Sequence, residues 1–287
     1  MSRSTDNLNL YLLNVGFINL KGNWNWKNVY SPFARIYYVT NGSAKTYIDT
    51  KMYVLKSGNL YLIPPFTKHE DECDSLFSHY YIHFYEEANK KELLFDQFDF
   101  PVEIKADTLD LLLIKRLLEI NPDRQLKYID PTIYDNMSSF SQLSAGNDKI
   151  PAHFVLESQA ILCRLISQFM KDAKPKIRYK DMRINKCIKY IHEHINENIS
   201  ISRLADIACT TEDHLTRIFK KETNNTPIKY MNLKRMETAQ LLLLTTNKSV
   251  SDIASNLSFN NIPYFNRLFK EHTNMTPGEY RSINIQR

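Results

Sequence analysis

The stretch Tyr264-Phe-Asn-Arg-Leu-Phe-Lys-Glu-His-Thr-Asn-Met-Thr-Pro277 repeats the pattern of His214-Leu-Thr-Arg-Ile-Phe-Lys-Lys-Glu-Thr-Asn-Asn-Thr-Pro227, which lies fifty residues earlier. A preceding pair of segments, Ile201-Ser-Arg-Leu-Ala-Asp-Ile-Ala208 and Val250-Ser-Asp-Ile-Ala-Ser-Asn-Leu257, matches at an offset of 49. Aromatic and charged positions stay in step through both pairs, so chance does not explain the match. The C-terminal part of the chain therefore contains one structural unit in two copies.

Each copy has the physical plan of two helices joined by a tight turn. A short helix carries a small residue, Ala205 or Ala254, where a second helix must cross closely. Thr211 or Asn260 then caps the second helix by accepting hydrogen bonds from its free N–H groups. The apolar residues of the second helix recur at i, i+3 and i+4, which leaves its opposite face free. These apolar residues are Leu215, Ile218 and Phe219 in copy one, and Phe265, Leu268 and Phe269 in copy two.

The free face of each second helix carries polar and basic groups, as a helix in the DNA major groove requires. We therefore interpret the copies as tandem helix-turn-helix units. A protein-binding solenoid of helical hairpins is the alternative, although most solenoids need about three or more copies. Asn224 and Asn274 follow the second helices where a left-handed C-cap is expected, and Thr-Pro begins the next helix in both copies.

Positive charge is concentrated in the same region. The chain carries a net charge of +5, yet its residues from 176 onward contain 18 Lys and Arg against 11 Asp and Glu. The preceding residues contain 19 against 21. Such an asymmetry is typical of a polyanion-binding region joined to a neutral one.

The part of the chain before the repeat is first strand-rich and then helical. Short runs rich in Tyr, Ile and Val alternate with turn residues between positions 35 and 84, which predicts an antiparallel barrel or sandwich. Helix-period apolar positions follow at Leu109–Ile120 and His153–Met170. We expect an α+β fold of two domains, with residues 1–174 as a β-barrel with helices, 175–183 as a linker and 184–287 as an all-α domain.

Composition argues against several other classes of protein. The sequence has no apolar run of 18 residues and its first residues are polar, so we expect neither a membrane span nor a signal peptide. We find no Gly-rich phosphate loop and no nucleophile elbow, and we expect no catalysis. The cysteines have no paired spacing and are expected to be buried, reduced residues of a cytoplasmic protein. They are Cys73, Cys163, Cys187 and Cys209.

The C-terminal region resembles the DNA-binding domain of the AraC/XylS family of bacterial regulators. The resemblance covers about Ile184 to Arg281. Ser258 stands where the family usually has Gly before the Phe, and Asn224 and Asn274 replace the Gly that ends each recognition helix, which affects turn stiffness only. The matching segments are Arg235-Met-Glu-Thr-Ala-Gln-Leu-Leu242, Ile253-Ala254, Leu257-Ser-Phe259, Tyr264-Phe-Asn-Arg-Leu-Phe-Lys270 and Thr276-Pro-Gly-Glu-Tyr-Arg281.

The resemblance implies that the two recognition helices enter successive major grooves on one face of double-stranded DNA, about one turn (~34 Å) apart. Arg217 is the strongest candidate, because an arginine can address guanine through two hydrogen bonds. Arg267 could instead hold its helix against its own domain. The base-facing candidates are Asp213, Thr216 and Arg217 in copy one, and Ile262, Pro263, Tyr264 and Arg267 in copy two. Lys220, Lys221 and Lys270 are expected to reach phosphates, or alternatively to form a solvated face.

The strand-rich region resembles the cupin-like sensing domain of the same family, through Gly58-Asn-Leu-Tyr-Leu-Ile-Pro64, His69 and Tyr80-Tyr-Ile-His-Phe84. A cupin enzyme would show an early histidine pair and a Glu, but no His lies between Arg35 and Gly58. We therefore predict no metal and no cofactor. A metal site of His69, His79 and His83, and hence a metal-dependent cupin enzyme, is the alternative.

A barrel without a metal is a pocket for a small molecule. Aromatic side chains that stack on a sugar ring make a sugar the expected effector, although aromatics at strand spacing can equally be core. The predicted ligand-binding residues are Trp24, Trp26, Tyr37, Tyr38, His69, Tyr81 and His83. The helices at 109–120 and 154–170 are expected to form a homodimer interface, or else to cover the barrel. The sequence thus predicts an effector-responsive regulator, an activator by family habit; a DNA binder whose barrel only dimerises is the alternative.

Overall fold

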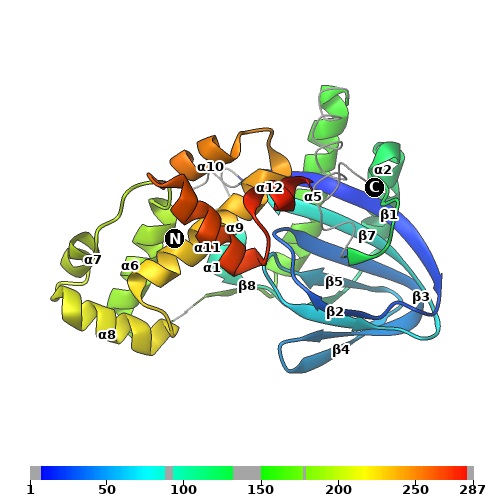
Figure 1. The fold of residues 1–287 in the computed structure, drawn as a ribbon. Coiled ribbons are helices and arrows are strands. Elements are labelled where there is room, and N and C mark those ends of the chain that lie inside the picture. The colour runs from blue at the N-terminus through cyan, green and yellow to red at the C-terminus, as the bar shows by residue number, and fades with distance from the viewer. Residues whose placement is uncertain (1–7, 88–92, 132–149, 177–178, 283–287) are drawn as a thin grey trace. The chain divides into compact units, whose positions relative to one another are not determined.

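The computed structural model describes residues 8–87, 93–131, 150–176 and 179–282. The chain forms two compact units (Figure 1). The sheet unit comprises residues 1–87 and 98–174, and the helical unit comprises residues 88–97 and 175–287. None of the helices in the described ranges is both long and apolar enough to cross a membrane.

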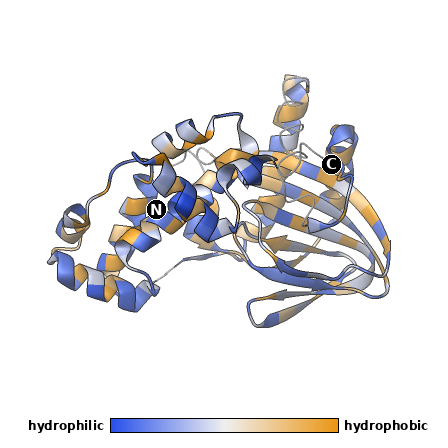
Figure 2. Ribbon diagram, in the orientation of Figure 1, coloured by the Kyte–Doolittle hydropathy of each residue, from blue (hydrophilic) through white to orange (hydrophobic). Residues whose placement is uncertain are grey.

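The sheet unit is built around one long strand, β3 (Ala34–Ile48). Its first half pairs with β5 and β7 and its second half pairs with β4 and β6, all antiparallel. The predicted antiparallel sheet is therefore confirmed, and Figure 2 shows hydrophobic and hydrophilic residues mixed along its strands. The other strands are β1 (Leu10–Lys21), β2 (Trp26–Val29), β4 (Lys51–Lys56), β5 (Asn59–Ile63), β6 (His69–Glu72), β7 (Leu76–Glu86) and β9 (Glu103–Lys105), with a small separate pair, β8 (Phe98–Asp99) and β10 (Lys174–Pro175).

Two helices of the sheet unit pack against β1. They are α2 (Thr108–Glu119) and α5 (Ala152–Met170), as their apolar periodicity predicts, and a 3₁₀ turn at Pro122–Arg124 follows α2. The side chain of Asp107 caps α2 by accepting from the N–H of Asp110, whose carboxylate in turn accepts from the N–H of Asp107. This reciprocal pair satisfies two N–H groups that the helix start would otherwise leave open.

The helical unit contains two hydrophobic cores, one for each sequence repeat. Ala205 and Ala254 are both buried, as close helix crossing requires. Its helices are α1 (Leu94–Gln97), α6 (Met182–Glu193), α7 (Ile201–Ile207), α8 (Glu212–Thr223), α9 (Pro227–Thr245), α10 (Val250–Asn256), α11 (Ile262–Thr273) and α12 (Pro277–Ser282).

The ends of the second helices follow the expected capping chemistry with one correction. Thr211 caps α8 by accepting from the N–H of His214. In copy two the cap is Asn261, which accepts from the N–H of Tyr264, so the prediction of Asn260 was wrong by one residue. Asn224 and Asn274 end the helices with φ of 58° and 61°, which confirms the predicted left-handed C-caps.

One short helix belongs to a different unit from the strands that flank it in the sequence. The helix α1 lies between β7 and β8 along the chain but belongs to the helical unit. Its Asp96 carboxylate lies 3.4 Å from Nδ1 of His192 and 3.8 Å from Nζ of Lys234. The backbone N–H and the ammonium of Lys176 donate to the carbonyls of Gln97 and Phe95. Side-chain and backbone bonds thus hold α1 within this unit.

Candidate functional site

The helix α8 presents a polar face opposite the first core. Leu215 and Phe219 are fully buried, whereas Asp213, Arg217, Lys220 and Lys221 are exposed and Thr216 is half-buried. Nη2 of Arg217 lies 2.8 Å from Nδ1 of His214, one turn earlier. Acidic residues occupy the first turn and basic residues the last, an arrangement that the helix dipole favours.

The equivalent face of α11 has a different chemistry. Pro263, Tyr264, Arg267 and Lys270 are exposed, while Ile262 packs partly against the second core. The Tyr264 hydroxyl accepts a hydrogen bond of 3.3 Å from the Asn232 amide on α9. The Arg267 guanidinium lies 5.3 Å from the Tyr264 ring centroid and its side chain is 67% exposed. This exposure favours a role for Arg267 on the surface over one in holding its helix against the core.

Three aromatic residues and a histidine meet in the core of the sheet unit. The rings of Trp24 and Tyr37 lie 5.4 Å and 5.2 Å from His79 and 5.9 Å from each other. Tyr81 belongs to the same cluster, and its hydroxyl accepts a hydrogen bond of 2.7 Å from the N–H of Leu126. Aromatic faces and polar atoms thus lie together in this core.

Buried polar groups lie on the strands around this cluster. His69 is 1% exposed and its Nδ1 lies 3.1 Å from the carbonyl of Thr67, so Nδ1 carries the proton and Nε2 is an acceptor. Nε2 lies 3.8 Å from a carboxylate oxygen of Asp71. Thr46 pairs with Asp71 across β3 and β6 and is fully buried. The fully buried Arg35 donates to the Ser31 hydroxyl at 2.6 Å.

Burial determines the charge of these groups. It lowers the pKa of His69 and of His79 to about 3, with the Arg35 guanidinium adding to the effect at His69. Burial likewise lowers the pKa of His83, again with Arg35. For Asp71, burial raises the pKa to about 7, against a hydrogen bond from Thr46 and the charge of Arg35. The three histidines are therefore neutral at pH 7, and the carboxyl of Asp71 exchanges its proton near that pH.

Most predicted ligand-binding residues lie together, and one does not. Trp24, Tyr37 and Tyr81 share a core against which Trp26 packs, and the ring of His83 lies 5.4 Å from that of Tyr81. His69 pairs across the strands with Ile48 of the same core. Tyr38 points to the opposite face of β3, where its ring lies 6.4 Å from that of Tyr80. Side chains alternate along a strand, so neighbouring tyrosines cannot share a face.

The sequence prediction missed the buried polar residues Arg35, Thr46 and Asp71. Arg35 lies two residues before Tyr37, and Asp71 lies two residues after His69. Strand alternation from the two predicted residues would therefore have placed both polar residues on the interior face. Within the described residues, no group of three His, Cys, Asp or Glu side chains is arranged to hold a metal ion.

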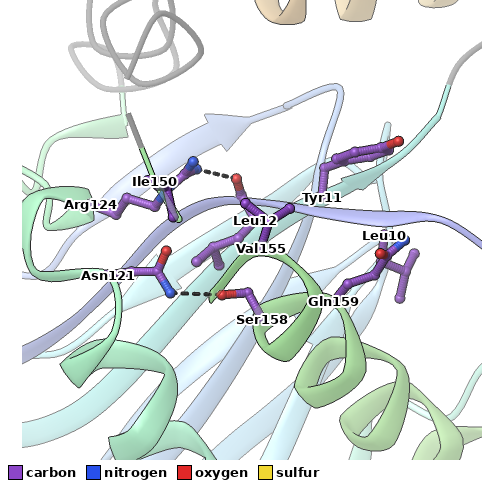
Figure 3. A pocket seen from close by; sticks show the side chains of 9 residues that line it. All are labelled: Leu10, Tyr11, Leu12, Asn121, Arg124, Ile150, Val155, Ser158 and Gln159. Atoms are coloured by element: carbon purple, nitrogen blue, oxygen red, sulfur yellow. Dashed lines mark hydrogen bonds between the residues drawn. The ribbon is translucent and has the colours of Figure 1, made fainter. Parts of the chain in front are cut away.

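A pocket of about 190 Å³ lies between β1, the turn after α2 and the start of α5 (Figure 3). Its polar side chains already bond within the protein, because the Asn121 amide donates to the Ser158 hydroxyl at 2.9 Å and the Arg124 guanidinium donates to the carbonyl of Leu12. This pocket is the weaker candidate for a ligand. Its lining residues are Leu10, Tyr11, Leu12, Asn121, Arg124, Ile150, Val155, Ser158 and Gln159.

Comparison with known families matches both units. Residues 204–283 match a helix-turn-helix domain, and residues 24–102 match an AraC-like ligand-binding domain. The chain belongs to the AraC family of transcription regulators. The two-domain architecture is thereby confirmed, and both matched domains are those of a transcription regulator.

Three relatives of this AraC-family chain illustrate the extent of the match. The regulator YbfP of Bacillus subtilis (strain 168) is 33% identical over 36% of this chain and 35% of its own length. The regulator YisR of the same strain is 25% identical over 92% of this chain and 90% of its own. The activator RhaS of Enterobacter sp. (strain 638) is 25% identical over 45% and 46%. The chain therefore spans about a third of YbfP, about half of RhaS and most of YisR.

Proposed function

We propose that this AraC-family protein is an effector-responsive transcription regulator that reads DNA with α8 and α11. One observation carries the proposal: two helix-turn-helix copies present exposed polar helix faces in the basic part of the chain. Residues 184–287 are assigned to DNA binding, 175–183 to a linker and 1–174 to sensing and dimerisation, apart from the helix α1, which belongs to the helical unit. The base contacts are assigned to Asp213, Thr216, Arg217, Pro263, Tyr264 and Arg267, with a smaller share for Ile262 because of its packing.

The experiment is a selection of genomic fragments on the purified full chain at fixed moderate salt. A shared motif with two half-sites about one helical turn apart is expected. Binding that does not depend on sequence and disappears as salt is raised would contradict the proposal. It would mean that the positive charge attracts any DNA without recognising a motif.

The phosphate role of the lysines is tested on the same motif. Lys220→Ala is expected to weaken all sequences alike and to flatten the dependence of log affinity on log salt by about one unit. Lys221→Ala and Lys270→Ala are expected to do the same, since all three side chains are exposed. A loss confined to particular bases would contradict the phosphate assignment.

A small sugar is the proposed effector, bound in the core of the sheet unit. The aromatic faces of Trp24, Tyr37 and Tyr81 and the buried polar atoms of His69 and Asp71 support it, because a sugar offers apolar C–H faces and hydroxyls together. We expect one member of a panel of sugars to raise the melting temperature. The variant Asp71→Asn should lose that shift, whereas Glu70→Gln, on the neighbouring position of β6 that is not fully buried, should keep it.

We further propose a homodimer that activates transcription. Exposed apolar side chains of α2 and α5 support the interface: Leu109, Leu112, Val155 and Leu156. The relative RhaS is a transcriptional activator, which supports the direction of regulation. Light scattering should give twice the chain mass, and Leu112→Glu with Leu156→Glu should give the monomer; an unchanged mass would leave these helices as a cover for the sheet.

A further inference from the structure

A buried arginine on α9 contacts the loop that precedes the first helix-turn-helix copy and an aromatic side chain of the second. Arg235 is 8% exposed, and its Nε and Nη2 donate to the carbonyls of Ile195 and Glu197 at 3.1 Å and 2.6 Å. These carbonyls lie in the loop between α6 and α7, and Ile195 of this loop packs against the core of copy one. Burial lowers the pKa of Arg235, because a buried charge is unfavourable unless partners such as these carbonyls stabilise it.

The same guanidinium also faces copy two. Its central carbon lies 5.5 Å from the ring centroid of Phe259, which belongs to the turn between α10 and α11. Phe259 is 5% exposed within the second core, and its ring lies 5.2 Å from that of Phe265 on α11. Arg235 is thus held between the loop that precedes copy one and a side chain that packs on the second recognition helix.

Ser258 makes a second, independent connection between the copies. It adopts the left-handed conformation with φ of 58°, at the turn position where the family usually has glycine. Its hydroxyl donates a hydrogen bond of 2.6 Å to the carbonyl of Asn196, in the loop that Arg235 also binds. Cys209 holds the equivalent position in copy one with φ of 47° and is exposed.

We propose that Arg235, Ser258 and Phe259 fix the position of α11 relative to α8 and so select the spacing between the two half-sites. The DNA part of this inference rests on the proposed function. Each base pair added between half-sites moves the second by about 3.4 Å and turns it by about a tenth of a helical turn. A rigid pair of recognition helices therefore fits one spacing, whereas a loosened pair accepts several.

The fixed position of α11 relative to α8 is tested first, without DNA. Spin labels are placed at exposed Lys221 on α8 and Glu271 on α11 in the full chain, with Cys163 and Cys209 replaced by Ser because the remaining cysteines are buried. The distribution of label distances is measured by pulsed electron paramagnetic resonance. Arg235→Met and Ser258→Ala are expected to broaden it, the first more than the second.

Two variants within copy one serve as matched controls. The Arg203 guanidinium lies 5.4 Å from the Tyr190 ring, so Arg203→Met removes a similar contact that joins no second copy. Ser202→Ala removes an exposed hydroxyl from α7. Both should keep the parent distribution. Unchanged widths in Arg235→Met and Ser258→Ala would overturn the inference; should Arg235→Met not fold, Ser258→Ala decides by the same criterion.

The consequence for DNA is tested on the selected motif with spacers lengthened or shortened by one base pair. The parent should prefer its best spacing by roughly tenfold, and Arg235→Met should lose most of that preference while selecting the same half-site sequences. A retained preference would overturn the inference even though DNA recognition held. Failure of the parent to select any motif would instead overturn the proposed function. The label distances would still show whether α11 is held in a fixed position relative to α8.

Discussion

The two helix-turn-helix copies share their interiors and differ on their surfaces. Leu215 and Phe219 of α8 and Phe265 and Phe269 of α11 are all fully buried, and both helices end in a left-handed asparagine. Close packing restricts what a buried position accepts. The first turns are not restricted in this way, since α8 begins with Glu and Asp whereas α11 begins with Ile and Pro.

The two recognition helices thus share one packing arrangement but present different chemistry in their first turns. An acidic first turn can accept hydrogen bonds from cytosine amino groups, whereas an apolar and aromatic first turn suits contact with thymine methyl groups. The half-sites are therefore expected to differ in sequence. An asymmetric pair of half-sites gives each chain a single orientation on the duplex.

The largest expected effect comes from the arginine of copy one. Arg217→Ala should weaken binding by roughly tenfold or more at the motif, through loss of about 1–3 kcal/mol of discrimination against wrong bases. Fluorescence anisotropy on motifs altered in one half-site at a time measures this. The loss should disappear on duplexes whose first half-site is already altered, and Arg203→Ala, also exposed, should have little effect; an equal loss on every duplex would contradict base recognition by Arg217.

Tyr264 should produce a smaller loss, restricted to copy two. Tyr264→Ala removes an exposed side chain whose hydroxyl accepts from the Asn232 amide and whose ring lies 5.3 Å from the Arg267 guanidinium. We expect about a fivefold loss, near 1 kcal/mol, visible only on duplexes with an intact second half-site. Tyr264→Phe is the control that keeps the ring and removes the hydroxyl. Should the same loss persist on a duplex with an altered second half-site, the two copies would not read independently.

Exchanging the charges at one pair of equivalent positions in α8 and α11 tests which of the two helices approaches the phosphates. The position after the equivalent lysines is Lys221 in α8 and Glu271 in α11. Glu271→Lys should raise affinity severalfold for all sequences and steepen the salt dependence by about 0.9. The mirror variant Lys221→Glu should do the reverse. Titration at two salt concentrations measures both, and an unchanged slope would place these positions away from the phosphates.

The smallest expected effect is on stability. Cys209 and Ser258 occupy equivalent turns in the left-handed conformation, which costs a residue other than glycine about 1 kcal/mol. Cys209→Gly should raise the free energy of unfolding by about 0.5–1 kcal/mol. Ser258→Gly should give no gain, because it also removes the bond to Asn196. Urea unfolding measures both, and an equal gain in both variants would contradict a role for that bond.

The success of the sequence prediction followed from which features are local. The repeat, the C-caps and the helices α2 and α5 depend on spacing within one segment, and the structure confirms them. The cap of α11 was misplaced because two asparagines stand side by side at 260 and 261, although the fifty-residue offset from Thr211 points to Asn261.

Other features depended on strands or helices that are distant in the sequence. Composition alone does not reveal which of Tyr37 and Tyr38 faces inward; strand register does. A charged residue within a strand suggests the surface, yet Arg35 and Asp71 are buried. The contacts of Arg235 join a helix to carbonyls about forty residues earlier, and no local pattern predicts such a bond.

Because α1 belongs to the helical unit, truncation of this protein or exchange of its domains has to take account of it. A fragment that starts at residue 175 would contain every helix of the two repeats and still lack Asp96. Burial lowers the pKa of Lys234, but Glu237 and Asp96 together outweigh it and raise the pKa; the fragment would keep only the first of these two carboxylates. A chimaera that exchanges the helical unit therefore needs three junctions, one on each side of α1 and one before residue 175, whereas the order of the sequence suggests that a single junction suffices.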